Sequence, residues 1–294
     1  MKNIIVITGG AGFVCSNLIS FFLKKTNYNL ISLDNYSSGK KKNHIKNRRV
    51  KYLTGHTKKI DLILSRYKKN IKSLFHFGEF ARIYQSFKNF DNCLDYNLIG
   101  TQEVFKFCMK NNIKLIYSAT SASLGNKGKD KNLSPYAFTK SKNLELLENL
   151  KKWFNFKFEI IYFYNVYGPG QICTGPMATV VGIFEYHYKK NKPLPVVKPG
   201  TQSRRFTHIS DTVKVCFNAW KKNQCRHYSI TNKKTYSIIK LAKLFKSEIK
   251  LLPFRKGERF ASALTNLNLS NKVYRKYGTI NIKDYVNEFI RNNA

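Results

Sequence analysis

Residues 4–13 read IIVITGGAGF, an apolar, β-branched run that leads directly into a glycine-rich turn. A run without polar alternation is typical of a strand buried on both faces of a parallel sheet. Gly9 permits the tight turn, and Gly12 lets backbone N–H groups approach a pyrophosphate at the start of the next helix. Because the turn lies between a predicted strand and a helix predicted over 17–25, it indicates a dinucleotide site in a Rossmann-like sheet.

The next landmarks concern the identity of that dinucleotide. Cys15 replaces the third glycine of the spacing, and its small side chain still allows the helix to pack on the strand. A second strand, predicted over 29–33, ends at Asp34, about 20 residues beyond Gly12, where a carboxylate binds the adenosine ribose hydroxyls. A carboxylate there repels a 2′-phosphate, so NAD is favoured, while the lysine block 40–42 keeps NADP as a minority option.

Strands and helices alternate along the first half of the chain. Further strands are predicted over 50–53, 73–77, 114–117 and 158–163, and helices over 59–67, 84–110 and 135–153. This alternation predicts an α/β fold with a doubly wound parallel sheet, in which ligands bind at the carboxyl ends of the strands. We expect residues 1–165 to form a Rossmann-like NAD-binding domain. Residues 166–294 are expected to form mainly a smaller C-terminal substrate-binding lobe, with some segments returning to the sheet.

A second stretch, SPYAFTK over residues 134–140, places Tyr136 and Lys140 four positions apart at the predicted start of a helix. Positions i and i+4 share a helix face, so the phenol and the ammonium can point into one site. A nearby cation stabilises the phenolate and lowers the pKa of a tyrosine from about 10 toward neutrality. Tyr136 is therefore a candidate acid or base, close in sequence to the Ser/Thr-rich strand end that contains Thr120.

Charge and cysteine usage narrow the class of protein. The 294-residue chain has a formal net charge of +37, but its lysines are spread along the sequence without a nucleic-acid-binding motif. We therefore favour a lysine-rich surface over nucleic-acid binding, and note that a positive field attracts an anionic nucleotide. Six scattered cysteines without a Cys-x-x-Cys pair indicate reduced thiols in a cytoplasmic protein and no metal site. No apolar run approaches the roughly 20 residues of a membrane span, so no membrane partner is expected.

Together these landmarks resemble the extended short-chain dehydrogenase/reductase family, specifically NAD-dependent nucleotide-sugar epimerases of the UDP-glucose 4-epimerase type. The resemblance extends over essentially the whole chain. It is carried by the turn at 8–13, Asp34-Asn35, Asn97-x-x-Gly100-Thr101, the strand end at 118–120, Tyr136-x-x-x-Lys140, the segment 164–169, and Arg204-x-Phe206-Thr207-His208-Ile209-x-Asp211.

The resemblance implies roles for individual residues. Tyr136 is implied as the catalytic base, Lys140 as the cation that lowers its pKa and holds the nicotinamide ribose, and Thr120 as the partner of the sugar hydroxyl that is oxidised. The implied NAD-binding residues are Gly9, Gly12, Phe13, Val14, Asp34, Asn35, Phe77, Gly78, Asn97, Ser118, Tyr136, Lys140 and Tyr164. The implied substrate-binding residues are Thr120, Asn165, Arg204 and Arg255, the two arginines as clamps on the diphosphate.

The chain also departs from the family pattern. His56 stands where an acidic residue usually contacts adenine, and the usual His-Leu-Ala-Ala reads HFGE over residues 76–79. The usual Arg-Asp-Phe has become Arg204-Arg205-Phe206. We interpret His76 as a packed histidine at a strand end rather than a proton carrier. Ser262 is near a site where related epimerases use side-chain size to admit or exclude an N-acetyl group, and a serine favours admission.

The implied reaction inverts C4 of a UDP-hexose through a transient 4-keto sugar, with NAD as the cofactor and a homodimer as the assembly. A 4,6-dehydratase is disfavoured because Thr120 is followed by Ser121 and Ala122, which lack the acid and base of that elimination. A nucleotide-sugar reductase or decarboxylase remains open, since both reuse the same triad. A non-catalytic nucleotide- or nucleic-acid-binding protein is a further alternative, disfavoured by the intact Tyr136 and Lys140 pair.

Overall fold

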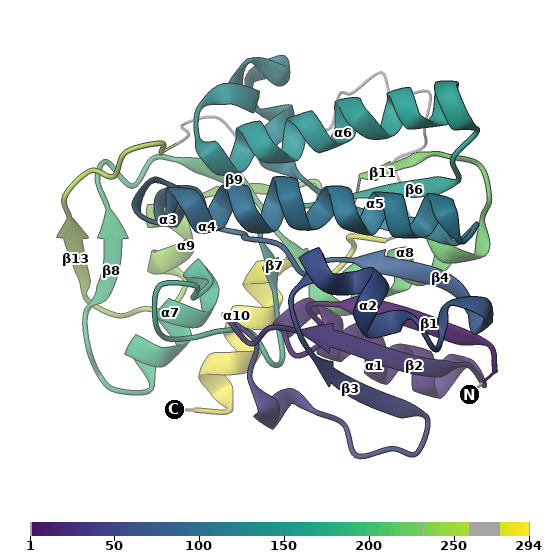
Figure 1. Cartoon of the computed structure of the whole chain (residues 1–294). Coiled ribbons are helices and arrows are strands. Elements are labelled where there is room, and N and C mark those ends of the chain that lie inside the picture. The colour runs from purple at the N-terminus through teal and green to yellow at the C-terminus, as the bar shows by residue number, and fades with distance from the viewer. Residues whose placement is uncertain (1, 230, 259–276, 294) are drawn as a thin grey trace.

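A parallel seven-stranded sheet forms the centre of the molecule (Figure 1). The structure, a computed structural model, describes residues 2–229, 231–258 and 277–293. The strand order is β11-β6-β5-β4-β1-β2-β3, and each neighbouring pair is parallel. The strands are β1 (Ile4–Thr8), β2 (Asn29–Asp34), β3 (Val50–Thr54), β4 (Ile71–His76), β5 (Lys114–Thr120), β6 (Phe158–Phe163) and β11 (His227–Ser229). The order reverses direction at β1 and β4, which is the place where doubly wound sheets bind ligands.

Helices cover both faces of the sheet, as the continuous apolar strands require. One core lies under α2 (Ile60–Leu64), α5 (Gly100–Lys110) and α6 (Pro135–Phe154). The opposite core lies under α1 (Phe13–Lys25) and α8 (Ile209–Lys221). Cys15 is buried in this second core, so a small side chain does occupy the position of the third glycine. The predicted α/β, doubly wound parallel sheet is confirmed.

The helix predicted over 84–110 is wrong as a single element. It consists of α3 (Ile83–Lys88), α4 (Phe90–Leu94), a π-helical turn η4 (Asp95–Ile99) and α5. Asn89 separates the first two helices because its backbone, at φ −126° and ψ 56°, has left the helical region. No glycine or proline between 84 and 99 signals this break, so the sequence pattern could not place it.

The chain beyond residue 165 builds a third core and also returns to the sheet. The third core is formed by α7 (Val180–Tyr188), β8 (Leu194–Val197), α9 (Ile238–Lys243) and α10 (Ile282–Arg291), with β13 (Ile249–Leu252) paired to β8. The returning elements are α8 and β11, and β11 forms one edge of the sheet beside β6. The division at residue 165 stays a prediction.

Short elements complete the described chain. The remaining strands are β7 (Val166–Tyr167), β9 (Ser203–Arg205), β10 (Thr207–His208) and β12 (Thr235–Ser237). The 3₁₀ segments are η1 (Lys41–Asn43), η2 (Thr57–Lys59), η3 (Lys68–Asn70) and η5 (Ser121–Asn132).

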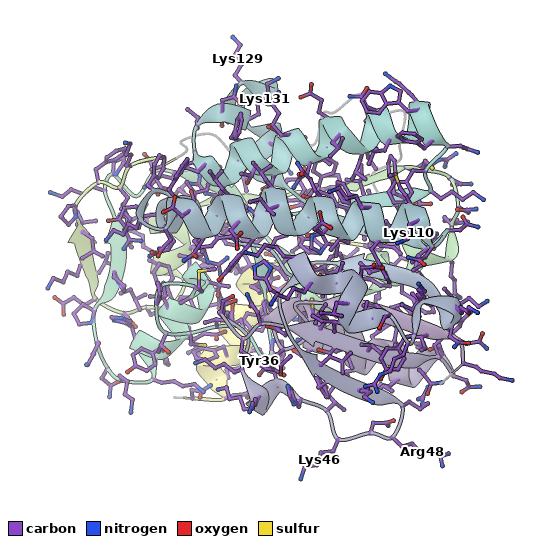
Figure 2. All side chains as sticks on the ribbon, viewed as in Figure 1. Tyr36, Lys46, Arg48, Lys110, Lys129 and Lys131 are labelled. Carbon is purple, nitrogen blue, oxygen red and sulfur yellow. The ribbon has the colours of Figure 1, made fainter. Side chains whose placement is uncertain are left out.

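The charge of the chain is displayed around its periphery. Figure 2 shows Lys129 and Lys131 extending outward at the top and Lys46 and Arg48 at the bottom. These four and Lys110 are exposed. Within the described ranges no helix is long and apolar enough to cross a bilayer, and no group of three metal-ligating side chains occurs.

Candidate active site

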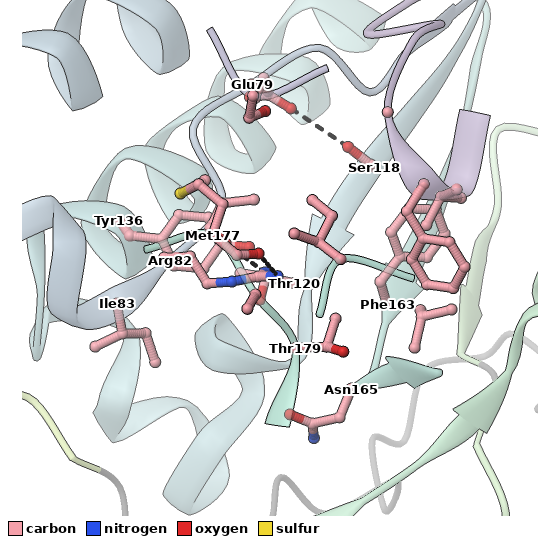
Figure 3. Close-up of a pocket in the computed structure, with 18 of the residues that line it drawn as sticks. Glu79, Arg82, Ile83, Ser118, Thr120, Tyr136, Phe163, Asn165, Met177 and Thr179 are labelled. Carbon is pink, nitrogen blue, oxygen red and sulfur yellow. Dashed lines mark hydrogen bonds between the residues drawn. The ribbon is translucent and has the colours of Figure 1, made fainter. Parts of the chain in front are cut away.

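The candidate active site is a cavity of about 560 Å³ at the carboxyl ends of the sheet strands (Figure 3). The predicted residues that line it are Gly9, Gly12, Phe13, Val14, Asp34, Asn35, Phe77, Gly78, Ser118, Thr120, Tyr136, Lys140, Tyr164, Asn165, Arg204 and Arg255. The fold therefore brings together residues that are up to 246 positions apart, from Gly9 to Arg255, in one cavity.

The glycine turn and the end of β4 touch backbone to backbone. Gly9 has φ +72°, and a Cβ built on it would lie 2.8 Å from the Cα of Gly78. A Cβ built on Gly78 would lie 2.6 Å from the backbone nitrogen of Gly9. Both glycines are therefore required by this approach, which leaves the start of α1 open to the cavity.

Asp34 ties the second strand to the glycine turn. Its Oδ2 accepts a hydrogen bond from the backbone N–H of Ala11 at 2.9 Å, and its Oδ1 accepts from Tyr36 N–H at 2.8 Å. Each carboxylate oxygen keeps a further lone pair, so the fixed carboxylate can still accept from the two hydroxyls of a ribose.

Asn97 is not among the described residues that line this cavity, and its predicted role in binding NAD stays a prediction. Its Oδ1 accepts from Phe80 N–H at 2.6 Å, while its Nδ2 donates to Phe80 O at 3.1 Å and to Thr139 Oγ1 at 3.1 Å. These bonds satisfy a buried amide side chain and fix the segment that follows β4. In this structure the side chain holds that segment in place.

Tyr136 is held by the first turn of α6. Ser134 caps the helix, with its Oγ accepting from Ala137 N–H at 3.1 Å, and Pro135 fits the first helical position. The backbone N–H of Tyr136 donates to Ser86 Oγ at 3.3 Å, which docks the helix start on α3. Thr120 comes from the end of β5, and its Oγ1 accepts from Ala122 N–H at 3.1 Å. Tyr136 and Thr120 thus reach the cavity from two rigid elements.

Lys140 is paired with Glu79, a residue that the sequence analysis noted only as a departure. The two side chains are 3% and 1% exposed, and Lys140 Nζ donates to Glu79 Oε2. Nζ also donates to the backbone O and the Oγ of Ser118, and lies 4.6 Å from the centre of the Tyr117 ring. Burial lowers the pKa of Lys140, and the Glu79 carboxylate opposes that shift. The lysine is therefore fixed in a place largely closed to water, with the Glu79 carboxylate favouring its charged form.

Arg82 is a site residue that the sequence analysis missed. It lies between the end of β4 and α3 and lines the cavity, and Figure 3 shows its side chain beside Tyr136 and Met177. Nη1 donates to Ala81 O at 2.8 Å, Nη2 donates to Met177 O, and Nε is buried with no hydrogen-bond partner among the residues that the structure describes. Burial lowers the pKa of Arg82, and the charge of Tyr136 opposes that shift. Nothing distinguished this arginine among 53 lysines and arginines in the sequence.

His76 is buried at the end of β4, as expected for a packed histidine. Its Nδ1 lies 2.8 Å from Thr8 Oγ1, and its Nε2 lies 2.9 Å from Thr101 Oγ1. Thr101 in turn donates to Glu79 Oε1 at 3.1 Å, so we assign the ring proton to Nε2, which donates to Thr101. Burial lowers the pKa of His76 to about 4. The ring is therefore neutral at physiological pH.

The opposite wall of the cavity carries the predicted substrate residues. Arg204, on β9, donates from Nη2 to Glu258 Oε1 at 2.6 Å, and Arg255 lies 5.3 Å from the centre of the Tyr84 ring. Asn165 donates from Nδ2 to Arg205 O at 2.8 Å, which leaves its carbonyl oxygen for a ligand. Ser262 falls outside the described residues.

The residues present fit a dinucleotide. The turn at Gly9 and Gly12 leaves the first N–H groups of α1 without a side-chain cap, which suits a pyrophosphate. Asp34 suits the adenosine ribose, while His56 replaces the usual acidic residue in the cavity wall. The His56 ring packs edge-on against Tyr96 at 4.8 Å, so an aromatic wall takes the place of a carboxylate.

Comparisons with known proteins agree with this geometry. Residues 5–232 match the NAD dependent epimerase/dehydratase family. A protein of Bacillus subtilis (strain 168) described as an uncharacterized UDP-glucose epimerase is 29% identical over 227 residues, which are 71% of this chain and 70% of that protein. An ADP-L-glycero-D-manno-heptose-6-epimerase of Fusobacterium nucleatum is 26% identical over 233 residues, or 72% and 70%.

The fold comparison agrees with the sequence comparison. The crystal structure of a UDP-glucose 4-epimerase from Thermotoga maritima, solved with UDP-glucose, superposes with a TM-score of 0.85 at 24% identity. The match covers 98% of this chain and 99% of that one. The expected family and its cofactor, NAD, are confirmed: the chain belongs to the NAD dependent epimerase/dehydratase family.

Proposed function

We propose that this enzyme inverts C4 of a UDP-hexose, with tightly held NAD and a transient 4-keto sugar. The observation that carries the proposal is that Thr120, Tyr136 and Lys140 line one cavity with the glycine turn and Asp34. The name of the Bacillus subtilis relative supports a UDP-sugar, and Arg204 and Arg255 on the facing wall suit its diphosphate.

In the proposed reaction, Tyr136 accepts the proton of the sugar 4-hydroxyl at its phenolic oxygen. Thr120 Oγ1 orients that hydroxyl, and the cationic side of the cavity wall, which contains Lys140 and Arg82, favours the phenolate of Tyr136. NAD, when bound, takes up a hydride from C4 and returns it, so that no cofactor is consumed. After the keto sugar has turned in the cavity, so that the opposite face of C4 is presented for reduction, Tyr136 returns the proton to the oxygen on C4. Fixed orientation of these groups supplies much of the acceleration.

The test is a panel of UDP-hexoses incubated with the protein and NAD, with C4 epimers read by NMR and reduced cofactor read by absorbance. Epimer formation without net reduced cofactor is the expected result, and Tyr136→Phe should lower its rate by at least about 100-fold, because a positioned acid or base contributes 10²- to 10⁴-fold. Stoichiometric cofactor turnover would replace the proposal by a reductase or a decarboxylase.

The proposal includes a cytoplasmic homodimer. Large apolar side chains lie half-exposed along α4, η4 and the start of α6, namely Phe90, Ile99 and Phe138. Helices α5 and α6 lie side by side in Figure 1, so a second copy could pack its own pair against them. Six free cysteines are in keeping with a reducing compartment.

A further inference from the structure

Both carboxylate oxygens of Glu79 accept hydrogen bonds from neighbouring side chains. Its Oε1 accepts from Thr101 Oγ1 at 3.1 Å and from Tyr117 OH at 2.9 Å. Its Oε2 accepts from Lys140 Nζ and from Ser118 Oγ at 3.4 Å. A carboxylate with a side chain that is 1% exposed and is bonded on both oxygens is held at a fixed place.

The pair that Glu79 forms changes the charge seen by the rest of the site. Lys140 directs its N–H groups to Glu79 Oε2 and to the backbone O and Oγ of Ser118. Glu79 and Lys140 therefore form an ion pair with no net charge. Without the Glu79 carboxylate, the ammonium group of Lys140 would be an isolated cation. Because the dielectric constant of a buried site is low, the Glu79 carboxylate strongly reduces the electrostatic potential that Lys140 produces around it.

Among the other titratable groups that the structure describes near Tyr136 and Lys140, Arg82 is the one that carries a charge near pH 7. From β4, His76 has a pKa of about 4; from α4, Cys93 has a pKa raised to about 11; and from β5, burial raises the pKa of Tyr117. All three are uncharged near pH 7. Arg82, which precedes α3, carries a charge, and no carboxylate among the described residues is paired with it.

We propose that Glu79 is a positioning residue that fixes Lys140 and screens its charge, so that Arg82 supplies the unscreened positive charge beside the Tyr136 phenol. The division of labour follows from geometry: Glu79 is bonded to Lys140, whereas Arg82 is bonded to two backbone carbonyls and keeps its charge. Tyr136 is joined to the same wall through Ser86, four positions beyond Arg82. The catalytic importance of this arrangement rests on the proposed function, but the arrangement of charges does not.

The test measures the pKa of Tyr136 directly, without turnover. Protein labelled with ¹³C at the tyrosine ζ carbon gives one resonance per tyrosine, and the one missing from Tyr136→Phe belongs to Tyr136. Glu79→Gln keeps the size of the side chain and removes its charge. Lys140 retains Ser118 O and the Tyr117 ring as partners in this variant. We expect the pKa of Tyr136 to fall by about one unit in Glu79→Gln.

Arg82→Gln is the matched opposite change, because it removes a positive charge from the same wall. The pKa of Tyr136 is expected to rise by about one unit in Arg82→Gln. In Glu79→Asp and Arg82→Lys, which keep the charge, the pKa of Tyr136 should be close to its value in the parent protein. A merely structural role would not produce shifts of opposite sign. An unchanged or raised pKa in Glu79→Gln, or an unchanged pKa in Arg82→Gln, would overturn the proposal. If Glu79→Gln does not fold, Glu79→Met removes the same charge and gives the same readings.

The kinetic counterpart uses whichever sugar the panel identifies. The acid limb of the kcat/KM profile should move to lower pH in Glu79→Gln and to higher pH in Arg82→Gln, by the shifts seen in the NMR titration. Silence on every sugar would count against the proposed function alone, because the NMR titration would still show the opposite shifts. Opposite shifts that leave the acid limb in place would overturn the assignment of Tyr136 as the base.

Discussion

The protonation state of His76 is set by its complete burial and by the hydroxyl groups of Thr8 and Thr101. Thr8 Oγ1 accepts from the backbone N–H groups of Phe77 and Gly78, so its own proton is directed at His76 Nδ1. A proton added to Nδ1 would face another proton, in a place from which water is excluded. The network extends through Thr101 to Glu79, and therefore links the end of β4 to the charged pair at Lys140.

This network predicts a specific loss of stability in acid. The folded pKa of His76, about 4, lies below the 6.5 of an unfolded histidine, so the unfolded chain takes up the proton first. The contribution is complete above about pH 6.5 and is lost as the pH falls through 4, by about 2 kcal/mol between pH 7 and pH 5. Urea unfolding at the two pH values should show this extra slope in the parent and not in His76→Gln. Equal slopes would contradict the assigned burial.

Single residues differ in how far the sequence could predict them. Gly9, Asp34, Tyr136 and Lys140 were predictable because their spacing reflects a local turn, a strand end and a helix face. The partners of Lys140 were not, because Glu79 meets it through a contact between residues 61 positions apart. Arg82 depends in the same way on Met177, 95 positions away.

The start of α6 shows how one helical element sets the geometry of the site. The Ser134 cap, Pro135 and the bond from Tyr136 N–H to Ser86 fix the first turn, and Tyr136 projects from that turn. A helix was predictable here from its serine cap and N-terminal proline. The break at Asn89 in the preceding helical region was not, since no glycine or proline marks it in the sequence.

Removing the cap should therefore affect both stability and rate. Ser134→Ala is expected to cost about 1 kcal/mol of unfolding free energy, because the Ala137 N–H loses its acceptor. Asn281→Ala at the cap of α10 is the matched control, since Asn281 Oδ1 accepts from Lys283 N–H at 3.0 Å and α10 does not line the cavity. Both variants should lose stability in urea, and only Ser134→Ala should lower kcat, by several-fold. A similar kcat in the two variants would show that the first turn does not position Tyr136.

At the scale of the whole molecule, the proposed dimer gives the apolar helix surface a partner. Ile99→Asp places a charge in the middle of that surface and should convert a dimer into a monomer in sedimentation velocity. Leu251→Asp, at an equally exposed apolar position on β13, is the control and should leave the mass unchanged. A parent protein that sediments as a monomer at micromolar concentration would refute the proposed assembly.

Because β11 comes late in the chain and pairs with β6 at the edge of the central sheet, this sheet can be completed only after β11 has been synthesised. The buried Glu159 carboxylate on β6 accepts from Gln224 N–H, Arg226 N–H and Tyr228 OH, which are supplied by β11 and the segment that leads into it. Among the described residues, the cation paired with that carboxylate is Lys114, at 3.8 Å, on the earlier strand β5. A chain that ended before β11 would leave β6 as an open sheet edge, and docking of the late strand would close it.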